Sequence, residues 1–551
     1  MDTGALNLLV FREERRCVSG SELKNRLLNE LSDAALVRSQ EVLLRALLRS
    51  GELECCLADS DHSPAFLQTV TDQLAEALVG IGSPPNGLLR AAVAEAPVPE
   101  QMRVSVPEGF AYYALDPLAY ADVVDRPILS SDTVIVVGIR SIGTTLSAVT
   151  AAAVKKRGRA VSRMTVRPGG HAYDRRMQFS VPQLALIQQG LADGADFLVV
   201  DEGPGLSGSS FLSVAEALLG AGVPRINITL ICGYQPDPER FCCTEGPRRA
   251  RQFRWAPVAG RQCKPEGADF YIGGGEWRKI LFAEEKQWPA SWTNFERVKY
   301  LSAPHSTEPR LFKFLGLGHY GDEVLDREQL VAEAGFGPSP RRENHGFVSY
   351  PRLRGRPMSP RDLNESALCR IAEYCAFRQR NFRQRVSNLD SLQQMAEHNL
   401  AQLHLNVPIK LELQYAVVAD GRMQPHEWLL LPEGHMLKTD SGSHGDDHFF
   451  PGPTDIAWDL AGAIVEWGMD ERQAEAFLAN YRRASNDDAT ERIGDYIVAY
   501  LAFRSAYCLM AANAMQGTEE SERLQNAAQR YREALAAGRA GLRMAVLSSS
   551  S

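Results

Sequence analysis

The sequence predicts an α/β protein with more than one domain, as its length, composition and hydrophobic pattern show. The chain has 551 residues, of which 44% are hydrophobic and 23% are charged, as in an ordinary globular protein with a sizeable core. From about residue 105 to residue 235, short apolar runs alternate with helical patterns, as in "TVIVVGI" followed by "TTLSAVTAAAVKKRG". This alternation is typical of a parallel sheet wrapped by helices.

Three segments follow one another along the chain. Residues 1–85 carry leucines and alanines at helical spacing, and "GIGSPPNG" breaks this pattern with glycine and proline. Residues 86–266 contain the alternating pattern and end in a basic, cysteine-containing connector. Residues 267–545 open with hairpin-like strands and continue into long helical patterns, which predicts an α+β domain.

Charge and cysteine usage limit the classes of function. The net charge of −8 and the pI near 5.9 give no overall basic footprint for nucleic acid. The ten cysteines form no C-x-x-C pair, which indicates a reducing compartment. An irregularly spaced zinc site is the weaker alternative, from Cys232, Cys242, Cys243 and Cys263.

The hydropathy pattern indicates a cytoplasmic protein. The first residues lack the long apolar core of a signal peptide, and we expect no stretch to approach the ~20 apolar residues of a membrane helix. We therefore expect small-molecule substrates and no nucleic-acid or membrane partner. A homodimer is left open.

The stretch "FLVVDEGPGLSGSSF" carries the first candidate site. Residues 197–200 form an apolar run typical of a buried parallel strand, and Asp201 and Glu202 follow at its carboxyl end. Ligands of open α/β sheets bind at that edge. The small residues after Glu202 lead into a helical pattern, so free backbone amides and a helix start would suit a phosphate.

This stretch resembles the signature of type I phosphoribosyltransferases, which bind phosphoribosyl pyrophosphate (PRPP). The resemblance implies that the catalytic-site carboxylates Asp201 and Glu202 bind the ribose hydroxyls. It implies a 5′-phosphate loop made of Gly205, Leu206, Ser207, Gly208, Ser209 and Ser210. The match departs in its second acid, which is Glu, and in a loop that is one residue longer than the common form.

Two further stretches stand where that family binds pyrophosphate. "VVGIRSIGTTLSAV" supplies Arg140, Ser141, Gly143 and Thr144. "TVRPGGHAYDRR" supplies Arg167, His171, Arg175 and Arg176 beside two glycines. Arginine pairs well with phosphate oxygens, and Mg²⁺ would neutralise a leaving pyrophosphate. The alternatives are a simple turn after the strand and a solvated charged face.

The stretch "LPEGHMLKTDSGSHGDDHFFPGPTDIAWDLAG" carries the second candidate site. It resembles the C-terminal lobe of aminoglycoside phosphotransferases and choline-kinase-like enzymes. The resemblance implies that Asp440 binds a metal and that Asp455 and Asp459 have a structural role. Upstream, "RLFKF" offers Lys313 as the phosphate-pairing lysine of ATP, and "IGGGEW" stands where a glycine-rich loop would cover the phosphates. The acidic partner of the lysine is either Glu323 or Glu328.

The predicted catalytic loop, "ADGRMQPHEWLLL", departs from that family. The family has a catalytic Asp and, five residues later, an Asn. Here Arg422 stands at the Asp position, and Glu427 stands at the Asn position, which would lie on the nucleotide side. Asp420 can therefore serve as the base only if the loop is reshaped. The neighbouring cluster Asp440, His444, Asp446, Asp447 and His448 admits a metal site of its own or a solvated loop.

Together these patterns predict a helical N-terminal segment, a parallel-sheet type I phosphoribosyltransferase-like domain and a two-lobed kinase-like α+β domain. The leading hypothesis is a pentosyltransferase that moves phosphoribose from PRPP to a nitrogenous base or related acceptor. The fused ATP-binding domain would serve the same pathway and could add a second, small-molecule kinase activity. The alternative is a regulatory protein that senses PRPP and nucleotide without turnover.

Overall fold

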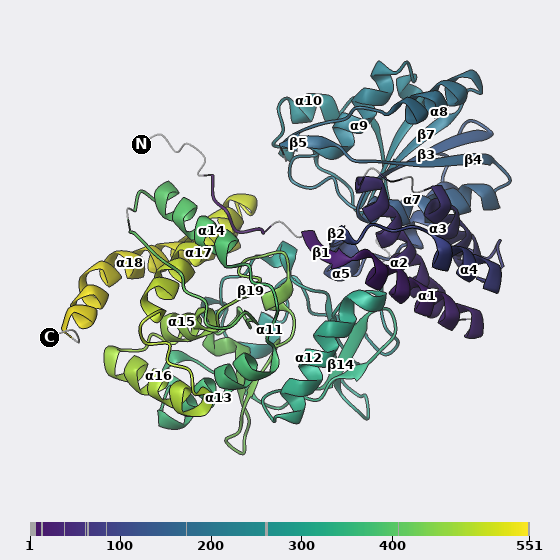
Figure 1. The fold of residues 1–551 in the computed structure, drawn as a ribbon. Coiled ribbons are helices and arrows are strands. Elements are labelled where there is room, and N and C mark those ends of the chain that lie inside the picture. Colours follow the sequence, from purple (N-terminus) through teal and green to yellow (C-terminus); the bar gives the residue numbers. More distant parts are fainter. Residues whose placement is uncertain are drawn as a thin grey trace.

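The computed structural model describes residues 7–12, 15–37, 39–60, 62, 65–83, 85–171, 173–258, 263–405 and 407–548. Figure 1 shows a parallel-sheet part at upper right, a larger mixed part at lower left, and the short helix α5 (Glu108–Ala111) near their junction.

The N-terminal segment is helical, as its leucine spacing predicts. Its helices are α1 (Gly20–Leu36), α2 (Gln40–Asp59), α3 (Ala65–Leu78) and α4 (Gly87–Glu95). Strand β1 (Arg15–Ser19) pairs antiparallel with β2 (Gln101–Ser105). Side-chain oxygens of Ser19 and Ser39 accept backbone N–H groups at the starts of α1 and α2 and so satisfy groups that the helix leaves free.

A five-stranded sheet in the order β4-β3-β7-β8-β9 confirms the predicted parallel sheet, because every neighbouring pair is parallel. Its strands are β3 (Thr133–Ile139), β4 (Ala160–Val166), β7 (Asp196–Val200), β8 (Ile228–Cys232) and β9 (Arg254–Pro257). All residues of β7 and β8 are buried, in agreement with the apolar run at residues 197–200 of β7.

Helices and one hairpin surround this sheet. They are α6 (Ala119–Asp122), α7 (Ile142–Lys156), α8 (Val181–Ala192), α9 (Ser209–Gly220), α10 (Gly246–Ala250) and the hairpin of β5 (Gly169–His171) with β6 (Asp174–Arg176). Ala148 and Val149 of α7 share one buried cluster with Leu47 of α2 and Leu74 of α3. The N-terminal helices therefore pack directly on the parallel-sheet part.

A second five-stranded sheet is antiparallel, in the order β10-β11-β12-β14-β13. Its strands are β10 (Phe270–Tyr271), β11 (Lys299–Leu301), β12 (Arg310–Phe314), β13 (Arg341–Arg342) and β14 (Phe347–Pro351). Helix α11 (Arg278–Leu281) lies between β10 and β11 in sequence, and α12 (Asp322–Glu333) lies between β12 and β13.

The remainder of the chain is mostly helical and encloses the largest buried cluster. Its helices are α13 (Glu365–Asn381), α14 (Leu389–Gln402), α15 (Ala457–Glu466), α16 (Glu471–Ser485), α17 (Ile493–Ala514) and α18 (Glu519–Ser548). Two small sheets carry the loops of the candidate site: β15 (Arg356–Pro357) with β17 (Trp428–Leu430) and β18 (Met436–Lys438), and β16 (Val417–Val418) with β19 (Pro453–Thr454).

Helix α17 corrects one expectation from the sequence. Among the described residues it is the helix long and apolar enough to cross a membrane, with 22 residues and a mean hydropathy of 1.3 in its most apolar window. However, 72% of that window is buried inside the protein. A helix of the protein core has this pattern.

Candidate functional site

The antiparallel sheet places Lys313 between two carboxylates. Lys313 lies on β12, and its side chain is 3% exposed. Its Nζ is 3.8 Å from Oε1 of Glu328 on α12 and pairs directly with the carboxylate of Asp440. Ser443 Oγ lies 3.2 Å from the same Nζ. Of the two acidic partners expected from the sequence, the structure brings Glu328 to the lysine, whereas Glu323 is exposed.

A second lysine, not predicted from the sequence, reaches the same carboxylate. Lys299 on β11 is the register partner of Lys313 on β12. Its Nζ lies 3.3 Å from Asp440 Oδ2. Burial alone would raise the pKa of Asp440, but Lys313, His444 and Lys299 hold it well below the usual value. Asp440 is therefore a carboxylate at neutral pH.

Asp440 stands two residues after β18, at a tight turn with φ of 55°, and a short loop folds over it. Nε2 of His444 lies 3.1 Å from Asp440 Oδ2, and Nδ1 of the same ring lies 3.5 Å from Asp447 Oδ2. The imidazole thus bridges two carboxylates of the predicted cluster. The Asp446 side chain lies outside the described residues.

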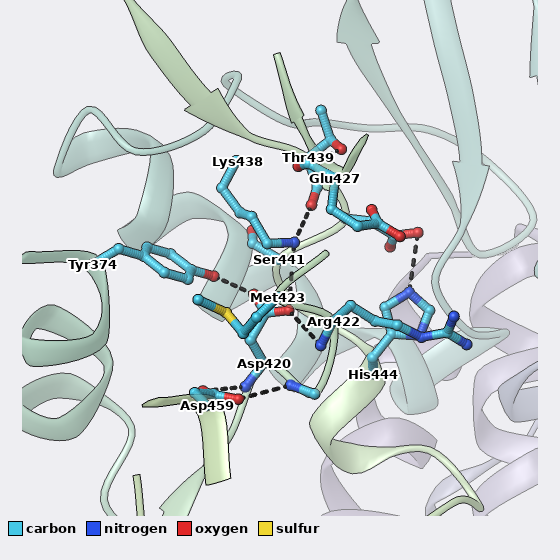
Figure 2. A network of polar contacts seen from close by, with 12 residues as sticks. Tyr374, Asp420, Arg422, Met423, Glu427, Lys438, Thr439, Ser441, His444 and Asp459 are labelled. Carbon is cyan, nitrogen blue, oxygen red and sulfur yellow. Dashed lines mark hydrogen bonds and ion pairs between the residues drawn. The ribbon is translucent and has the colours of Figure 1, made fainter. Parts of the chain in front are cut away.

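The carboxylate of Asp420, predicted as a conditional base, faces into the helical part. Asp420 is 1% exposed and accepts a hydrogen bond from the Tyr374 hydroxyl. Its carboxylate is 3.4 Å from Lys438 Nζ and 3.6 Å from Arg378 Nη1. Figure 2 shows Asp420 between Tyr374 and Lys438. This placement favours a structural role for Asp420.

The two aspartates of "DIAWDLAG", Asp455 and Asp459, accept hydrogen bonds from backbone N–H groups, in line with the structural role expected for them. Asp459 accepts the backbone N–H groups of Asp420 at 2.7 Å and Gly421 at 2.9 Å, and burial raises its pKa to about 6. Asp455 accepts from Gln414 N and Arg492 Nε. The start of the catalytic loop is thereby held in place.

Arg422 and Glu427 occupy the two positions where the loop departs from the kinase pattern. Both side chains are partly exposed, and Figure 2 shows them extending to the side of Asp420 on which His444 lies. The Arg422 guanidinium lies over the Tyr507 ring, with 5.9 Å from Cζ to the ring centroid. Burial alone would raise the pKa of Glu427, but the nearby charges of Lys438 and His426 lower it below the usual value.

The glycine-rich segment lies against this loop. Trp277 stacks on His426 with ring centroids 6.0 Å apart, and its indole N–H donates to Glu296. Gly275 has φ of 85° and donates its N–H to the same Glu296 over 2.8 Å. The segment after β10 is thus anchored beside the catalytic loop.

Asp201 and Glu202 do stand at the carboxyl end of β7, as the sequence predicts. Burial raises the pKa of Asp201 to about 7. Burial and the nearby Glu108 raise the pKa of Glu202 well above its usual value. Oε2 of Glu202 accepts the N–H of Gly109 over 2.5 Å.

Residues 108–113, the bridging segment, connect this edge to the second candidate site. At one end Gly109 donates to Glu202. In the middle the carbonyl of Phe110 accepts the N–H of Leu317 over 2.8 Å. At the other end the Tyr113 hydroxyl lies 3.3 Å from Nε2 of His448. The two candidate sites therefore lie on opposite ends of one short segment.

The predicted phosphate loop has the conformation that its glycines allow. Gly205 and Gly208 have φ of 62° and 66°, which side chains disfavour. A Cβ on Gly208 would lie 2.6 Å from the Phe241 ring. Leu206 is 52% exposed and its carbonyl accepts Cys242 N, while the hydroxyls of Ser207 and Ser209 lie 3.0 Å apart. The Ser210 carbonyl accepts the Ser213 hydroxyl in the first turn of α9.

The arginines predicted to bind pyrophosphate divide into two groups. Arg140 and Arg167 both pair with Asp59 at the end of α2, and Arg167 also donates to the Arg140 carbonyl over 3.0 Å. By contrast, His171, Arg175 and Arg176 lie on or beside the β5–β6 hairpin, where Arg176 pairs with Asp174 at 3.2 Å. The structure does not gather these five residues at one point.

The start of α7 lies next to Asp201. Ser141 has φ of 97° and ψ of −118°, a strained conformation for a residue with a side chain. A Cβ on Gly143 would meet the Val200 carbonyl at 2.7 Å and Asp201 Oδ1 at 3.6 Å. The Thr144 hydroxyl is buried without a hydrogen-bond partner. Ser141, Gly143 and Thr144 therefore do neighbour the end of β7.

Comparison with known proteins finds a likeness in structure alone. No family model matches the chain, and no curated protein is similar to it. The choline kinase LicA from Streptococcus pneumoniae is 16% identical over 43% of this chain and 89% of that chain, with a TM-score of 0.32. A choline/ethanolamine kinase family protein from Mesorhizobium loti is 16% identical over 49% and 98%, with a TM-score of 0.32. The Plasmodium vivax ethanolamine kinase is 9% identical over 44% and 79%, with a TM-score of 0.31.

These comparisons correct the leading hypothesis. The similar structures are kinases and phosphotransferases, with a kinase-like fold over about half of the chain, so the predicted PRPP-dependent pentosyltransferase is wrong. Identities this low concern the fold alone, and the site is therefore argued from its own residues. A physical reason for the error is visible in Asp59, which already pairs with Arg140 and Arg167, two of the four arginines that the hypothesis assigned to pyrophosphate.

Proposed function

We propose that residues 267–545 bind ATP with Mg²⁺ at the interface between the antiparallel sheet and the helical part. The observation that carries the proposal is the position of Lys313, buried between Glu328 and Asp440. A lysine on a sheet strand, held by a helix carboxylate and facing a metal-binding aspartate, is the arrangement with which kinases pair nucleotide phosphates. Lys299 adds a second positive charge at the same point.

The carboxylates present fit Mg²⁺. This ion binds oxygen ligands and is commonly held by one or two carboxylates, with phosphates and waters completing its shell. Asp440 after β18 and Glu427 before β17 supply two such carboxylates, close enough to influence each other's pKa. No ready-made group of three or more His, Cys, Asp or Glu ligands occurs in the part of the chain that the structure describes. When bound, Mg²⁺ would neutralise phosphate charge.

A nucleotide-sensing role without turnover is the second candidate. It is favoured by Arg422, which stands where a hydroxyl-phosphorylating kinase has its base, and by the inward placement of Asp420. Binding of ATP is common to both candidates. Release of ADP with formation of a phosphorylated product separates them.

The remaining expectations accompany this proposal. No disulfide joins the ten cysteines, all of which lie in the described part of the chain. We accordingly propose a cytoplasmic location and small-molecule partners.

Calorimetric titration of ATP into the full-length protein, with and without Mg²⁺, tests the proposal. Lys313→Ala and Asp440→Ala should each weaken binding at least tenfold, because a charged hydrogen bond is worth roughly 1.5–3 kcal/mol. Lys286→Ala is the matched control, since its side chain is 76% exposed and pairs only with a neighbouring glutamate among described residues. Unchanged affinity in both site variants, with the fold intact by circular dichroism, would rule the proposal out.

A further inference from the structure

The catalytic loop presents a cation where a hydroxyl kinase presents a base. The backbone N–H of Arg422 donates to Asp420 Oδ1 over 3.1 Å, and Asp459 fixes the two preceding N–H groups. Asp420 and Asp459 therefore hold the backbone of the loop, and the Arg422 side chain extends from it to the side on which His444 lies (Figure 2). Asp420 itself extends away, toward Tyr374 and Lys438.

The Arg422 guanidinium makes no direct ion pair with a carboxylate within the described ranges. It lies over the Tyr507 ring, and the charges of Glu427 and Asp447 act on it, as does the like charge of Arg504. Arg504 is already matched by Glu466 at 3.4 Å and by the Tyr531 hydroxyl. A partly exposed guanidinium without a direct carboxylate pair can bind an external anion with two parallel N–H donors.

Among the described side chains, no carboxylate near Arg422 is placed to act as the base that a hydroxyl acceptor needs. Asp420 faces Lys438 and Arg378 inside the helical part. Asp447 is engaged by His444 and by the N–H of Phe449. Glu427 holds the position proposed for the metal. Transfer to a hydroxyl requires removal of its proton, whereas a carboxylate or phosphate acceptor already carries a negative oxygen.

We propose that Arg422 binds the acceptor, and that the acceptor is an oxyanion, a carboxylate or a phosphate, instead of an alcohol. The inference rests on the proposed ATP binding. In the step, an acceptor oxygen forms a bond to the γ-phosphorus of ATP while the bond from that phosphorus to the β,γ-bridging oxygen breaks. The electron pair of the broken bond leaves with ADP, and no proton is taken from the acceptor. The product is an acyl phosphate or a phosphoanhydride.

The test begins with the full-length protein saturated with Mg²⁺ and a non-hydrolysable ATP analogue. Inorganic phosphate, acetate and choline are titrated separately, as phosphate, carboxylate and hydroxyl probes. We expect phosphate or acetate to bind, Arg422→Gln to weaken that binding at least tenfold, and Arg422→Lys to weaken it less. Arg380→Gln is the matched control, since Arg380 is exposed on α13 and donates to the Ala484 carbonyl.

The turnover arm uses ATP in place of the analogue and measures pyrophosphate, acetyl phosphate and phosphocholine. Formation of pyrophosphate identifies a phosphate acceptor, and formation of acetyl phosphate identifies a carboxylate acceptor. Phosphocholine as the product, or anion binding that Arg422→Gln leaves unchanged, would overturn the inference. So would the failure of both anions to bind the nucleotide-loaded protein. If the analogue itself does not bind wild type, the proposed function fails instead, so the two failures are distinguishable.

Discussion

Lys299 and Lys313 are register partners on β11 and β12, and both ammonium groups reach the single carboxylate of Asp440. Neighbouring positions of an antiparallel pair project from the same face of the sheet, so the pairing of the two strands by itself aims both lysines at the end of β18. Two cations against one anion leave a net positive charge at this point, before Glu328 is counted.

Lys299→Ala should weaken binding of ATP by about tenfold while leaving the fold intact. The ammonium group contributes one of the two charged contacts to Asp440, and such contacts are worth roughly 1.5–3 kcal/mol. Fluorescence titration with ATP measures the effect. Lys279→Ala, which removes an exposed lysine of α11, should change nothing. Equal ATP affinities of Lys299→Ala and wild type would show that Lys299 does not contact phosphate and that, of the two lysines, Lys313 alone does.

Asp420→Ala should destabilise the protein by about 3–5 kcal/mol, because it leaves the buried Lys438 without its carboxylate and Arg378 with Asp459 alone. Urea unfolding followed by circular dichroism gives the free energy of unfolding. The comparison is Glu284→Ala, which removes a pair with the exposed Lys286 and should cost at most about 1 kcal/mol. A stable Asp420→Ala variant that has lost phosphoryl transfer would instead return Asp420 to a catalytic role.

His448 should make the protein less stable in mild acid. Burial lowers its pKa from 6.5 to about 4, with Asp447 opposing and Arg297 and Arg12 adding to the shift. Since the folded state holds the lower pKa, the neutral ring contributes stability above about pH 6.5, and this is lost as the pH falls toward 4. The full loss from this group is up to about 3 kcal/mol.

Melting temperatures between pH 4 and pH 7 measure this dependence. His448→Phe should flatten the curve in that range, although it also removes the contact with the Tyr113 hydroxyl. An exposed histidine is the control: His171→Phe should leave the slope unchanged. Identical slopes for wild type and His448→Phe would show that other groups govern the acid response.

Ser141→Gly should stabilise the protein by about 1 kcal/mol. The backbone of Ser141 has φ of 97° and ψ of −118°, which costs a residue with a side chain roughly 1–3 kcal/mol, whereas glycine adds about 0.5–1 kcal/mol of unfolded-state entropy. Chemical denaturation measures the change. Ser39→Gly, at a helix start with φ of −106°, should give no such gain. A loss of stability in Ser141→Gly would mean that the Ser141 side chain makes a contact worth more than the strain.

The sequence predicted those features that depend on local pattern. The apolar run of residues 197–200 forms most of β7, and Asp201 and Glu202 follow at its carboxyl end. Lys313 and Asp440 were identified because strand and turn residues surround them in a recognisable order. Lys299 was not predicted as part of this site, because only the register of β11 with β12 shows that it lies beside Lys313.

What could not be predicted depends on contacts between distant segments. Asp59 pairs with Arg140 and Arg167 across 81 and 108 residues, and no local pattern shows that these arginines are already paired. In the same way, Asp420 turns inward because Tyr374, 46 residues earlier, offers its hydroxyl. The pentosyltransferase hypothesis came from the resemblance of residues 197–211 to the PRPP signature, a local pattern that does not show how distant side chains pair.

The bridging segment, residues 108–113, contacts both halves of the chain. Gly109 holds Glu202 at one end and Tyr113 meets His448 at the other, with only three residues between them. If a ligand at one end shifts this segment, linkage requires the resulting change in affinity to be equal in both directions. Lengthening the segment by a few glycines would uncouple the two contacts without changing Glu202 or His448. The two halves would then respond independently to their ligands.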